Sequence, residues 1–315
     1  MDILCLGSAV VDILAAPVGR PDSWREKQRI ERIDFHLGGD AANQCVRLAD
    51  AGERVTACAA LGEDTNGALL RQLLEKRGVD TSRVAFRKDL PTGTALVLVD
   101  SEGNRSTFSV KGAHSTLQKS DLPDISDPSV RNLRAVSVAS LFSLPLLEED
   151  GLEQFLHRVK EKTRALVFAD LANDKLGLGL EGIRRFLPYV DYFLPSLYDA
   201  AAMTGQNSPA DIAACFHRCG CRNIIIKCGA DGCFFSTPED SGTVPAVRVR
   251  TVDTTGAGDC MSALFLHRIL AGDAVKEACR YACAGATLST LSPGASDTPV
   301  TDTRIRAFLR EHADR

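Results

Sequence analysis

The sequence of 315 residues lacks the features of membrane, nucleic-acid-binding and disordered proteins. No apolar run approaches the roughly 20 residues that a membrane-spanning helix needs. The chain also lacks an excess of positive charge, since its net charge is -4, which argues against nucleic acid or an anionic membrane surface as partner. It contains no internal repeat and no low-complexity tract. No basic stretch precedes the strand-like N-terminal segment, so we expect no signal peptide and a cytoplasmic protein.

Two common nucleotide-binding motifs are missing or misplaced. The phosphate-binding pattern GxxxxGK[ST] does not occur, which excludes a P-loop enzyme. Residues 177–182 match the dinucleotide fingerprint GxGxxG, but residues 171–176 separate them from the preceding strand-like run. The fingerprint needs a tight strand–turn–helix connection. A dinucleotide-dependent oxidoreductase is therefore disfavoured.

The eleven cysteines do not read as a disulfide framework, because their number is odd and many lie in apolar runs. This pattern is typical of reduced thiols in the cytosol. One cluster has potential metal ligands, namely Cys215, His217, Cys219 and Cys221. No second Cys/His pair follows at the spacing of a zinc finger. We therefore interpret these cysteines as buried free thiols at a helix end and the next strand.

What the sequence does contain is a regular alternation of strand-like and helical segments, with 44% hydrophobic and 25% charged residues, enough to bury a full core. The expected strands are residues 3–8, 55–61, 135–139, 165–170, 192–194 and 223–228. The expected helices are residues 41–51, 64–77, 146–162, 209–219, 257–271, 274–288 and a tail helix from residue 301. The alternation predicts an α/β fold with a doubly wound, mostly parallel sheet, in a single domain over residues 1–315.

Two stretches depart from this alternation. Residues 10–15 and 30–37 are β-like, and so are residues 94–100 and 106–110, which flank a good hairpin turn. Four β-like segments within an α/β frame predict a small inserted β-sheet, formed by about residues 10–37 and 92–111. Such a sheet could cover a site as a lid.

The most informative segment is Asp-Thr-Thr-Gly-Ala-Gly-Asp at residues 253–259, where a helix begins. Gly256, Ala257 and Gly258 have almost no side chain, so an anion can approach the free N–H groups of the helix start. Asp259 would oppose a bound phosphate unless it accepts a proton from an attacking hydroxyl. An anion cradle and a base within one helical turn predict phosphoryl transfer to an alcohol.

A second segment, residues 37–43, precedes another predicted helix. Its paired glycines, Gly38 and Gly39, let a substrate pack closely on the backbone, and Asn43 can both donate to and accept from hydroxyls. Asp12 follows the first strand and can hold two neighbouring hydroxyls. These positions lie at strand ends, where open α/β sheets bind their ligands. We therefore expect a polyol at this end of the sheet.

Gly38-Gly39 with Asn43, and the run from Asp253 to Asp259, resemble the two signatures of the ribokinase-like (PfkB) carbohydrate kinase family. The order and separation of the segments agree over essentially the whole chain. The resemblance implies a three-layer α/β/α sandwich with a β lid over a sugar, ATP as phosphoryl donor, Mg²⁺, Asp259 as catalytic base and the amides of residues 256–258 as anion hole. The substrate-binding residues that it implies are Asp12, Gly38, Gly39, Asp40 and Asn43.

The resemblance also assigns a nucleotide site. Residues 227–232 resemble the family's nucleotide loop, in which Gly229 and Gly232 would turn the chain over ATP and Lys227 would contact phosphate. Ser196 and Asp199 stand where the family has the Asn and Glu of an Asn-x-x-Glu segment, which helps to hold Mg²⁺ and phosphates through water. Aspartate keeps the hard oxygen ligands that Mg²⁺ prefers, but it is one methylene shorter. The two replacements put the affinity for Mg²⁺ in question.

Two further properties come from the resemblance alone. Some relatives bind a monovalent cation such as K⁺ beside the anion hole. By position, the residues that would line that site are Asp253, Thr255, Ser289, Ser292, Gly294 and Thr298. Many relatives pair through their lids, which implies a homodimer.

The substrate itself stays open, because a carboxylate and an amide suit pentoses, ketohexoses, sugar acids, inositols and the ribose of nucleosides alike. A nucleoside would need aromatic stacking, for which the candidates are Trp24, Phe35, Phe86 and Phe108. A phosphorylated sugar would need basic residues, for which the candidates are Arg105 and Lys111. We prefer an unphosphorylated sugar. A non-catalytic sugar-sensing protein on the same fold is the other alternative, because fold does not determine function.

Overall fold

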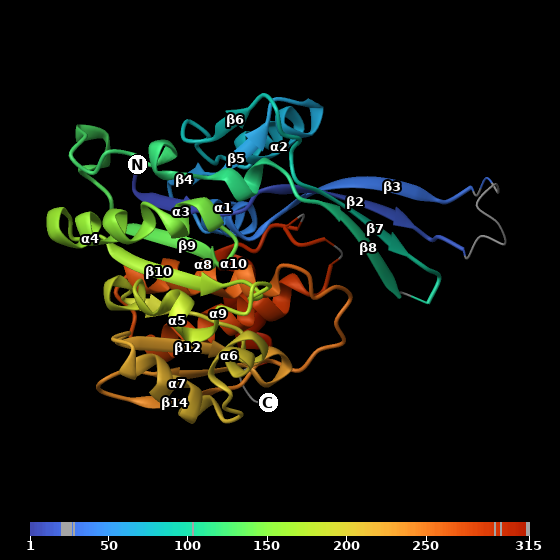
Figure 1. The fold of residues 1–315 in the computed structure, drawn as a ribbon. Coiled ribbons are helices and arrows are strands. Elements are labelled where there is room, and N and C mark those ends of the chain that lie inside the picture. Colours follow the sequence, from blue (N-terminus) through green and yellow to red (C-terminus); the bar gives the residue numbers. More distant parts are fainter. Residues whose placement is uncertain (20–26, 28, 103, 293, 297, 313–315) are drawn as a thin grey trace.

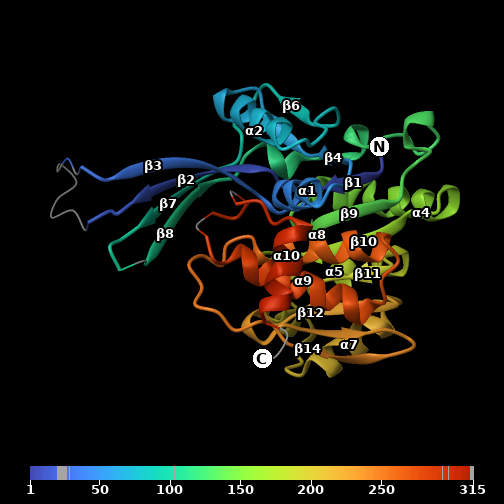
Figure 2. The same ribbon diagram turned by 180° about the vertical axis from the view of Figure 1, so that it is seen from behind.

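The computed structural model describes residues 1–19, 27, 29–102, 104–292, 294–296 and 298–312. A central sheet lies between two layers of helices (Figures 1 and 2). The order of its strands is β14-β13-β12-β11-β10-β9-β1-β4. Their bounds are β1 (Ile3–Leu6), β4 (Val55–Cys58), β9 (Ala135–Leu141), β10 (Leu166–Leu171), β11 (Tyr192–Phe193), β12 (Asn223–Lys227), β13 (Cys233–Ser236) and β14 (Ser241–Val244). This arrangement confirms the predicted three-layer α/β architecture.

The strands from β4 to β12 are parallel, whereas β13 and β14 extend the sheet in antiparallel fashion. Successive side chains of a strand point to opposite faces, and β1 illustrates this. Ile3 and Cys5 belong to the core on one face, and Leu4 and Leu6 to the core on the other. All four side chains are fully buried. Burial on both faces explains why the strands are continuous apolar runs.

The helices divide between the two faces. The layer nearer the viewer in Figure 2 contains α1 (Asp40–Asp50), α8 (Ala257–Leu270), α9 (Val275–Ser289) and α10 (Asp302–Glu311). The opposite layer contains α3 (Pro145–Glu149), α4 (Leu152–Lys162), α5 (Gly179–Arg184), α6 (Leu197–Thr204) and α7 (Pro209–Arg218). Helix α2 (Thr65–Lys76) lies at the β4 end of the sheet. Short 3-10 helices are η1 (Ala113–Thr116), η2 (Lys119–Asp121), η3 (Pro128–Val130), η4 (Leu187–Tyr189) and η5 (Gly229–Asp231). No described helix has the length and apolarity to cross a membrane.

The small inserted sheet projects from the body (Figure 1). Its order is β3-β2-β7-β8, formed by β2 (Val10–Ala16), β3 (Arg32–Gly38), β7 (Thr94–Val99) and β8 (Arg105–Val110). The register sorts its side chains by polarity, because Asp12 is paired with His36, whereas Ile13 is paired with Phe35 and Leu96. One face is therefore apolar along its length, and the other carries Asp12.

Two predicted segments are wrong in their continuity. The strand predicted at residues 55–61 is divided into β4 and β5 (Ala60–Gly62), and β5 leaves the central sheet to pair with β6 (Ala85–Arg87). The helix predicted at residues 146–162 is divided into α3 and α4. Gly151, which has a φ of 121°, lies between them in a conformation that side chains disfavour. The antiparallel strands β13 and β14 and the helix α6 were not expected.

Candidate active site

The backbone amides at the start of α8 are open, because residues 256–258 are glycine, alanine and glycine. Gly256 is the N-cap residue and has a φ of 69°, in the left-handed region that favours glycine. A methyl group at this position would lie 2.7 Å from Cβ of Ala295, so glycine is also required sterically. The Ala257 amide donates to the carbonyl of Thr254, at 3.2 Å. Among the described residues, no acceptor is assigned to the amides of Gly258 and Asp259. Such free amides at a helix start attract anions.

Asp259 lies in the first turn of α8 and contacts the start of α1. Its Oδ2 accepts a hydrogen bond of 2.9 Å from Nδ2 of Asn43. Burial raises the pKa of Asp259 well above its ordinary value, and the negative charge of Asp40 raises it further, whereas the bond from Asn43 opposes the rise. A carboxylate with a raised pKa is a stronger proton acceptor than an exposed one. The two sequence signatures therefore meet at one hydrogen bond.

The start of α1 differs, because its amides are occupied. Gly39 has a φ of 90°, and a methyl group there would lie 2.6 Å from the carbonyl oxygen of Ser8. That carbonyl accepts the amides of Ala41 and Ala42, at 3.1 and 3.3 Å. The hydroxyl of Ser8 accepts the amide of Asp40 at 3.1 Å. The first amides of this helix are therefore bonded to Ser8 and are not available to a ligand.

Asp12 lies beside this helix start, on the β2 strand of the inserted sheet. A methyl group on Gly38 would lie 2.4 Å from Oδ2 of Asp12, so the glycine leaves room for the carboxylate. Burial raises the pKa of Asp12 to about 6, and the neighbouring His36 opposes the rise. The structure thus brings four of the predicted substrate-binding residues together at the start of α1, namely Asp12, Gly38, Gly39 and Asn43.

A cavity of about 800 Å³ opens on the other side of Asp259. Its polar lining comes from the carboxyl ends of β10 and β12, the loop after β12 and the start of α8. The polar and glycine residues that line it include Asp40, Asp170, Ser196, Asp199, Lys227, Gly229, Gly232, Gly258 and Asp259. Its apolar lining includes Ala246, Val247, Val249, Met261 and Ala286. The structure thus brings the residues predicted for the nucleotide together with the predicted base.

Lys227 lines this cavity and makes contacts that the sequence did not indicate. Its ammonium group pairs with Oδ2 of Asp170 and lies 3.3 Å from the hydroxyl of Ser262. That hydroxyl donates to the same Asp170 oxygen at 2.8 Å. A methyl group on Gly258 would lie 3.5 Å from the Lys227 nitrogen, so the positive charge is adjacent to the free amides. Asp170 could have been found as the carboxylate near the end of a buried strand.

Ser196 and Asp199 cap α6 together. The Ser196 hydroxyl accepts the amide of Asp199 at 3.0 Å and donates to its carboxylate at 2.6 Å. Both residues line the cavity. Among the described residues, no group of three or more histidine, cysteine, aspartate or glutamate side chains is placed to hold a metal by itself. A cation here would need ligands from a bound nucleotide or from water.

The residues predicted for a monovalent cation come from two segments, one before α8 and one at the end of α9 and beyond it. The Asp253 carboxylate accepts the amides of Thr255 and Gly294, at 2.9 and 3.0 Å. The hydroxyl of Ser289 donates to the carbonyl of Ala286 at 2.7 Å. Ser292 is partly buried in the turn that follows α9. The carbonyl of Thr298 accepts from Nη1 of Arg47 at 2.6 Å, a contact that the sequence did not indicate.

The comparisons with known proteins agree with this geometry. The model of the pfkB family carbohydrate kinases matches residues 1–303. The chain belongs to this family. It is 28% identical to ribokinase of Haemophilus influenzae, over 90% of each chain, and 27% identical to 2-dehydro-3-deoxygluconokinase of Bacillus subtilis, over 87% of this chain and 86% of the relative. Its fold matches that of Arabidopsis thaliana ribokinase complexed with ribose and ATP, with a TM-score of 0.82, 24% identity and 98% coverage of both chains. The protein is a carbohydrate kinase.

Of the aromatic residues considered for a nucleoside, the three that the structure describes do not gather around Asp12 and Asn43. Phe35 and Phe108 lie on the apolar face of the inserted sheet, opposite to the face that carries Asp12. Phe86 lies on β6, outside that sheet. Trp24 and the side chain of Arg105 lie outside the described residues. Lys111 is exposed just after β8.

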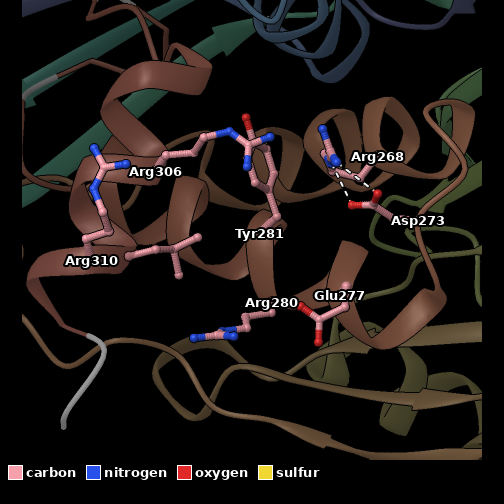
Figure 3. A pocket seen from close by; sticks show the side chains of 8 residues that line it. Arg268, Asp273, Glu277, Arg280, Tyr281, Arg306 and Arg310 are labelled. Atoms are coloured by element: carbon pink, nitrogen blue, oxygen red, sulfur yellow. Dashed lines mark hydrogen bonds and ion pairs between the residues drawn. The ribbon is translucent and has the colours of Figure 1, made fainter.

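The Cys/His cluster and a second cavity of the kinase lie elsewhere. His217 uses both ring nitrogens, toward the carbonyl of Cys221 and the hydroxyl of Ser236, at 2.9 and 2.8 Å. Cys215, Cys219 and Cys221 are buried free thiols. The second cavity, of about 340 Å³, is rich in arginine and surrounds Tyr281 (Figure 3). Its Arg268 is paired with Asp273 at 2.7 Å. We therefore place the chemistry in the first cavity.

Proposed function

We propose that this carbohydrate kinase transfers the γ-phosphoryl group of ATP to a hydroxyl of an unphosphorylated sugar or sugar-like polyol. The observation that carries the proposal is the position of Asp259. On one side Asp259 contacts Asn43, which lies near Asp12. On the other side it lines the large cavity together with Gly258, whose amide is free. A base at this junction can contact an acceptor hydroxyl and a phosphoryl group at the same time.

Asp259 accepts the proton of the acceptor hydroxyl as that oxygen attacks the γ-phosphorus. A bond forms between the acceptor oxygen and phosphorus, the bond from phosphorus to the bridging oxygen of ATP breaks, and ADP leaves. The free amide of Gly258, within the predicted anion hole of residues 256–258, and the ammonium of Lys227 stabilise the negative charge on the transferring oxygens. Asn43 fixes the carboxylate of Asp259 through its hydrogen bond of 2.9 Å.

The nucleotide fits the large cavity in two parts. The apolar side chains of Val247, Val249 and Ala286 suit an adenine ring, and Gly229 and Gly232 let the backbone approach the phosphates. The match in fold to a ribokinase complexed with ribose and ATP supports this assignment.

Mg²⁺ fits the charge of the cavity. Four carboxylates line it, those of Asp40, Asp170, Asp199 and Asp259, whereas Lys227 and Arg248 supply two positive charges. Burial raises the pKa of Asp40, and the charges of Asp170 and Asp199 raise it further, so these carboxylates repel one another. Asp199, with Ser196, would hold the ion through water and the phosphates. When bound, Mg²⁺ neutralises charge on the phosphates of ATP.

The inserted sheet would act as the lid, with its Asp12 face toward the sugar. Its opposite face exposes large apolar side chains: Ile33 by 59%, Phe35 by 51%, Phe108 by 58% and Val110 by 56%. A contiguous apolar face of this kind marks an interaction site. We assign it to a second copy of this chain, which would form a lid-to-lid homodimer. Sedimentation equilibrium of Phe35→Asp against the unchanged protein would detect the loss of such a dimer.

The experiment that tests the function measures ADP release with a panel of pentoses, hexoses, sugar acids, inositols and nucleosides. We expect at least one polyol to stimulate turnover. Asp259→Asn should reduce kcat on the order of 10²- to 10⁴-fold, the usual contribution of a general base, while the protein stays folded by circular dichroism. A melting-temperature screen with the same compounds identifies the ligands that bind.

Each outcome distinguishes the alternatives. Stimulation by nucleosides alone would replace the sugar with a nucleoside as acceptor. Binding of a sugar without any stimulated turnover would favour the non-catalytic sensor. Unchanged turnover in Asp259→Asn would refute the proposed base.

A further inference from the structure

Among the described residues, the largest fully buried side chain is a charged one, that of Arg47 in α1. It is 1% exposed, although a guanidinium group stays protonated at every physiological pH. The carboxylate that the described part of the chain places near it is that of Asp50, which is 3.6 Å away and makes two closer contacts of 2.7 Å with Arg77. A buried charge is retained only where its partners compensate for the loss of water. The main partners of Arg47 must therefore be sought elsewhere.

Those partners are carbonyl oxygens of the loop that follows α9. Nη1 of Arg47 donates to the carbonyl of Thr298 at 2.6 Å, and Nη2 donates to that of Ala295 at 2.8 Å. Arg77 donates to the carbonyl of Ser296 at 2.8 Å. Two arginines thus turn three carbonyls of this loop inward. Inward carbonyl oxygens are also the groups with which proteins hold K⁺.

This loop packs against Gly256, at the start of the proposed anion hole. A methyl group on Gly256 would lie 2.7 Å from Cβ of Ala295 and 2.9 Å from its carbonyl oxygen. The carbonyl that binds Arg47 is therefore the one against which the N-cap of α8 packs. The charge of Arg47 also reaches the first turn of α8, because it opposes the effect of burial, which raises the pKa of the Cys260 thiol to about 11.

Two of the residues assigned by family resemblance to a monovalent cation, Asp253 and Thr298, already accept hydrogen bonds from the protein. The carbonyl of Thr298 belongs to Arg47. Gly294 turns its amide toward Asp253, so a donor faces the carboxylate that would ligate the ion. The second oxygen of that carboxylate accepts the amide of Thr255. At Asp253 and Thr298, protein donors therefore stand where a cation would otherwise compensate the oxygens.

We propose that the guanidinium group of Arg47 is a built-in substitute for the monovalent cation, holding Ala295 and Thr298 beside the anion hole, so that this kinase needs no K⁺. Arg47 is a positioning residue that acts through Ala295 and Gly256. Its effect on turnover rests on the proposed kinase function, but its effect on the response to salt can be measured on the folded protein without a substrate.

The first test compares KCl, NaCl and tetramethylammonium chloride at constant ionic strength. We expect turnover to vary by less than about twofold among them, which corresponds to a negligible change in barrier. We also expect the same melting temperature in all three, because an ion that binds only the folded state would raise it. Stimulation by K⁺ above about tenfold, or a melting temperature raised by K⁺ alone, would overturn the proposal.

The second test separates charge from packing with Arg47→Met and Arg47→Lys. Both have long flexible side chains, but only lysine keeps the charge. We expect Arg47→Met to lower kcat on the order of 10- to 100-fold, as displacement of an anion hole does, and Arg47→Lys to lower it less. Equal activity of the two variants would contradict a role for the charge.

Arg77→Met is the matched control, because Arg77 holds the same loop at Ser296 without contacting Ala295. It should lower the melting temperature and leave kcat within about twofold of the unchanged protein. If Arg47→Met does not fold, the salt comparison on the unchanged protein still decides the proposal. If no acceptor is found, the proposed function fails. The proposal about K⁺ is then decided by the melting temperatures in the three salts, which need no substrate.

Discussion

The starts of α1 and α8 are two glycine-rich helix N-termini that meet at the Asn43–Asp259 hydrogen bond, yet they differ in chemistry. Ser8 occupies the first amides of α1, with its hydroxyl on Asp40 and its carbonyl on Ala41 and Ala42. At α8, the Ala257 amide is bonded to a nearby carbonyl, whereas the next two amides have no assigned acceptor among the described residues, and Gly258 and Asp259 line the cavity. A glycine-rich helix start therefore binds an anion only where the chain leaves its amides free. The pattern of small residues alone does not distinguish the two cases.

The comparison predicts its largest effect for Gly258→Ala, which adds a methyl group to the open helix start. The methyl would lie 3.5 Å from Nζ of Lys227, in ordinary contact, so the protein should fold. We expect kcat to fall on the order of 10²-fold, the cost of disturbing one oxyanion donor, because the methyl blocks the phosphate. Steady-state kinetics at saturating ATP measures this loss.

The same variant should be slightly more stable, by about 0.5–1 kcal/mol, because alanine loses less chain entropy than glycine in a helix. Gly242→Ala in β14 is the control, since its methyl would meet only the ring of Phe235 at 3.4 Å. A full kcat in Gly258→Ala would show that phosphate does not approach these amides.

A smaller effect is expected for Asp12→Asn, beside the closed helix start. The folded protein holds the Asp12 proton with a pKa of about 6, above the ordinary value of 3.8. Ionised Asp12 therefore destabilises the fold, and this cost appears as the pH rises from about 4 to about 6 and persists above. Removing the charge should stabilise the protein at pH 8 on the order of 2 kcal/mol, while sugar affinity is lost.

Urea denaturation at pH 8 and at pH 4, with the unchanged protein beside the variant, measures this difference. The gain in stability should shrink at the lower pH, where Asp12 is protonated in the folded protein. A gain that is equal at both pH values would contradict a buried carboxylate at this position.

The smallest effect is expected for Ser8→Ala, which opens one amide of the closed start. The variant loses the acceptor of the Asp40 amide, and loss of such a cap costs about 1 kcal/mol. The Ser8 carbonyl still holds Ala41 and Ala42, so kcat should change little. Thermal denaturation and steady-state kinetics together test this. A loss of kcat as large as that of Gly258→Ala would remove the distinction between the two helix starts.

Much of this arrangement can be predicted from the sequence, because it depends on local patterns. Continuous apolar runs indicate strands buried on both faces, and the run ending at Asp259 indicates a helix start with a base in its first turn. The pairing of Asn43 with Asp259 is consistent with the sheet placing both signatures at one edge. These features need only the periodicity of strands and helices and the small size of glycine and alanine.

The features that the sequence does not reveal depend on contacts between distant segments. Arg47 stands in a buried helical run beside Val46 and Leu48, and nothing local shows that carbonyls from beyond α9 turn toward it. The role of Asp170 is visible only from its ion pair with Lys227, which lies 57 positions away in the chain. The break at Gly151 and the antiparallel β13 and β14 depend on tertiary packing as well. Charged groups inside apolar runs are the residues to examine first in such a chain.

The hydrogen bond between Asn43 and Asp259 joins positions 216 residues apart in the chain. During synthesis, the sugar side leaves the ribosome long before the base and the anion hole exist. Under the proposed mechanism, a nascent or truncated chain that ends before α8 would have no base to activate an acceptor and would spend no ATP. With Asp259 as the proposed base, catalysis requires that about the last fifth of the polypeptide has docked, which makes enzymatic activity a reporter of complete folding.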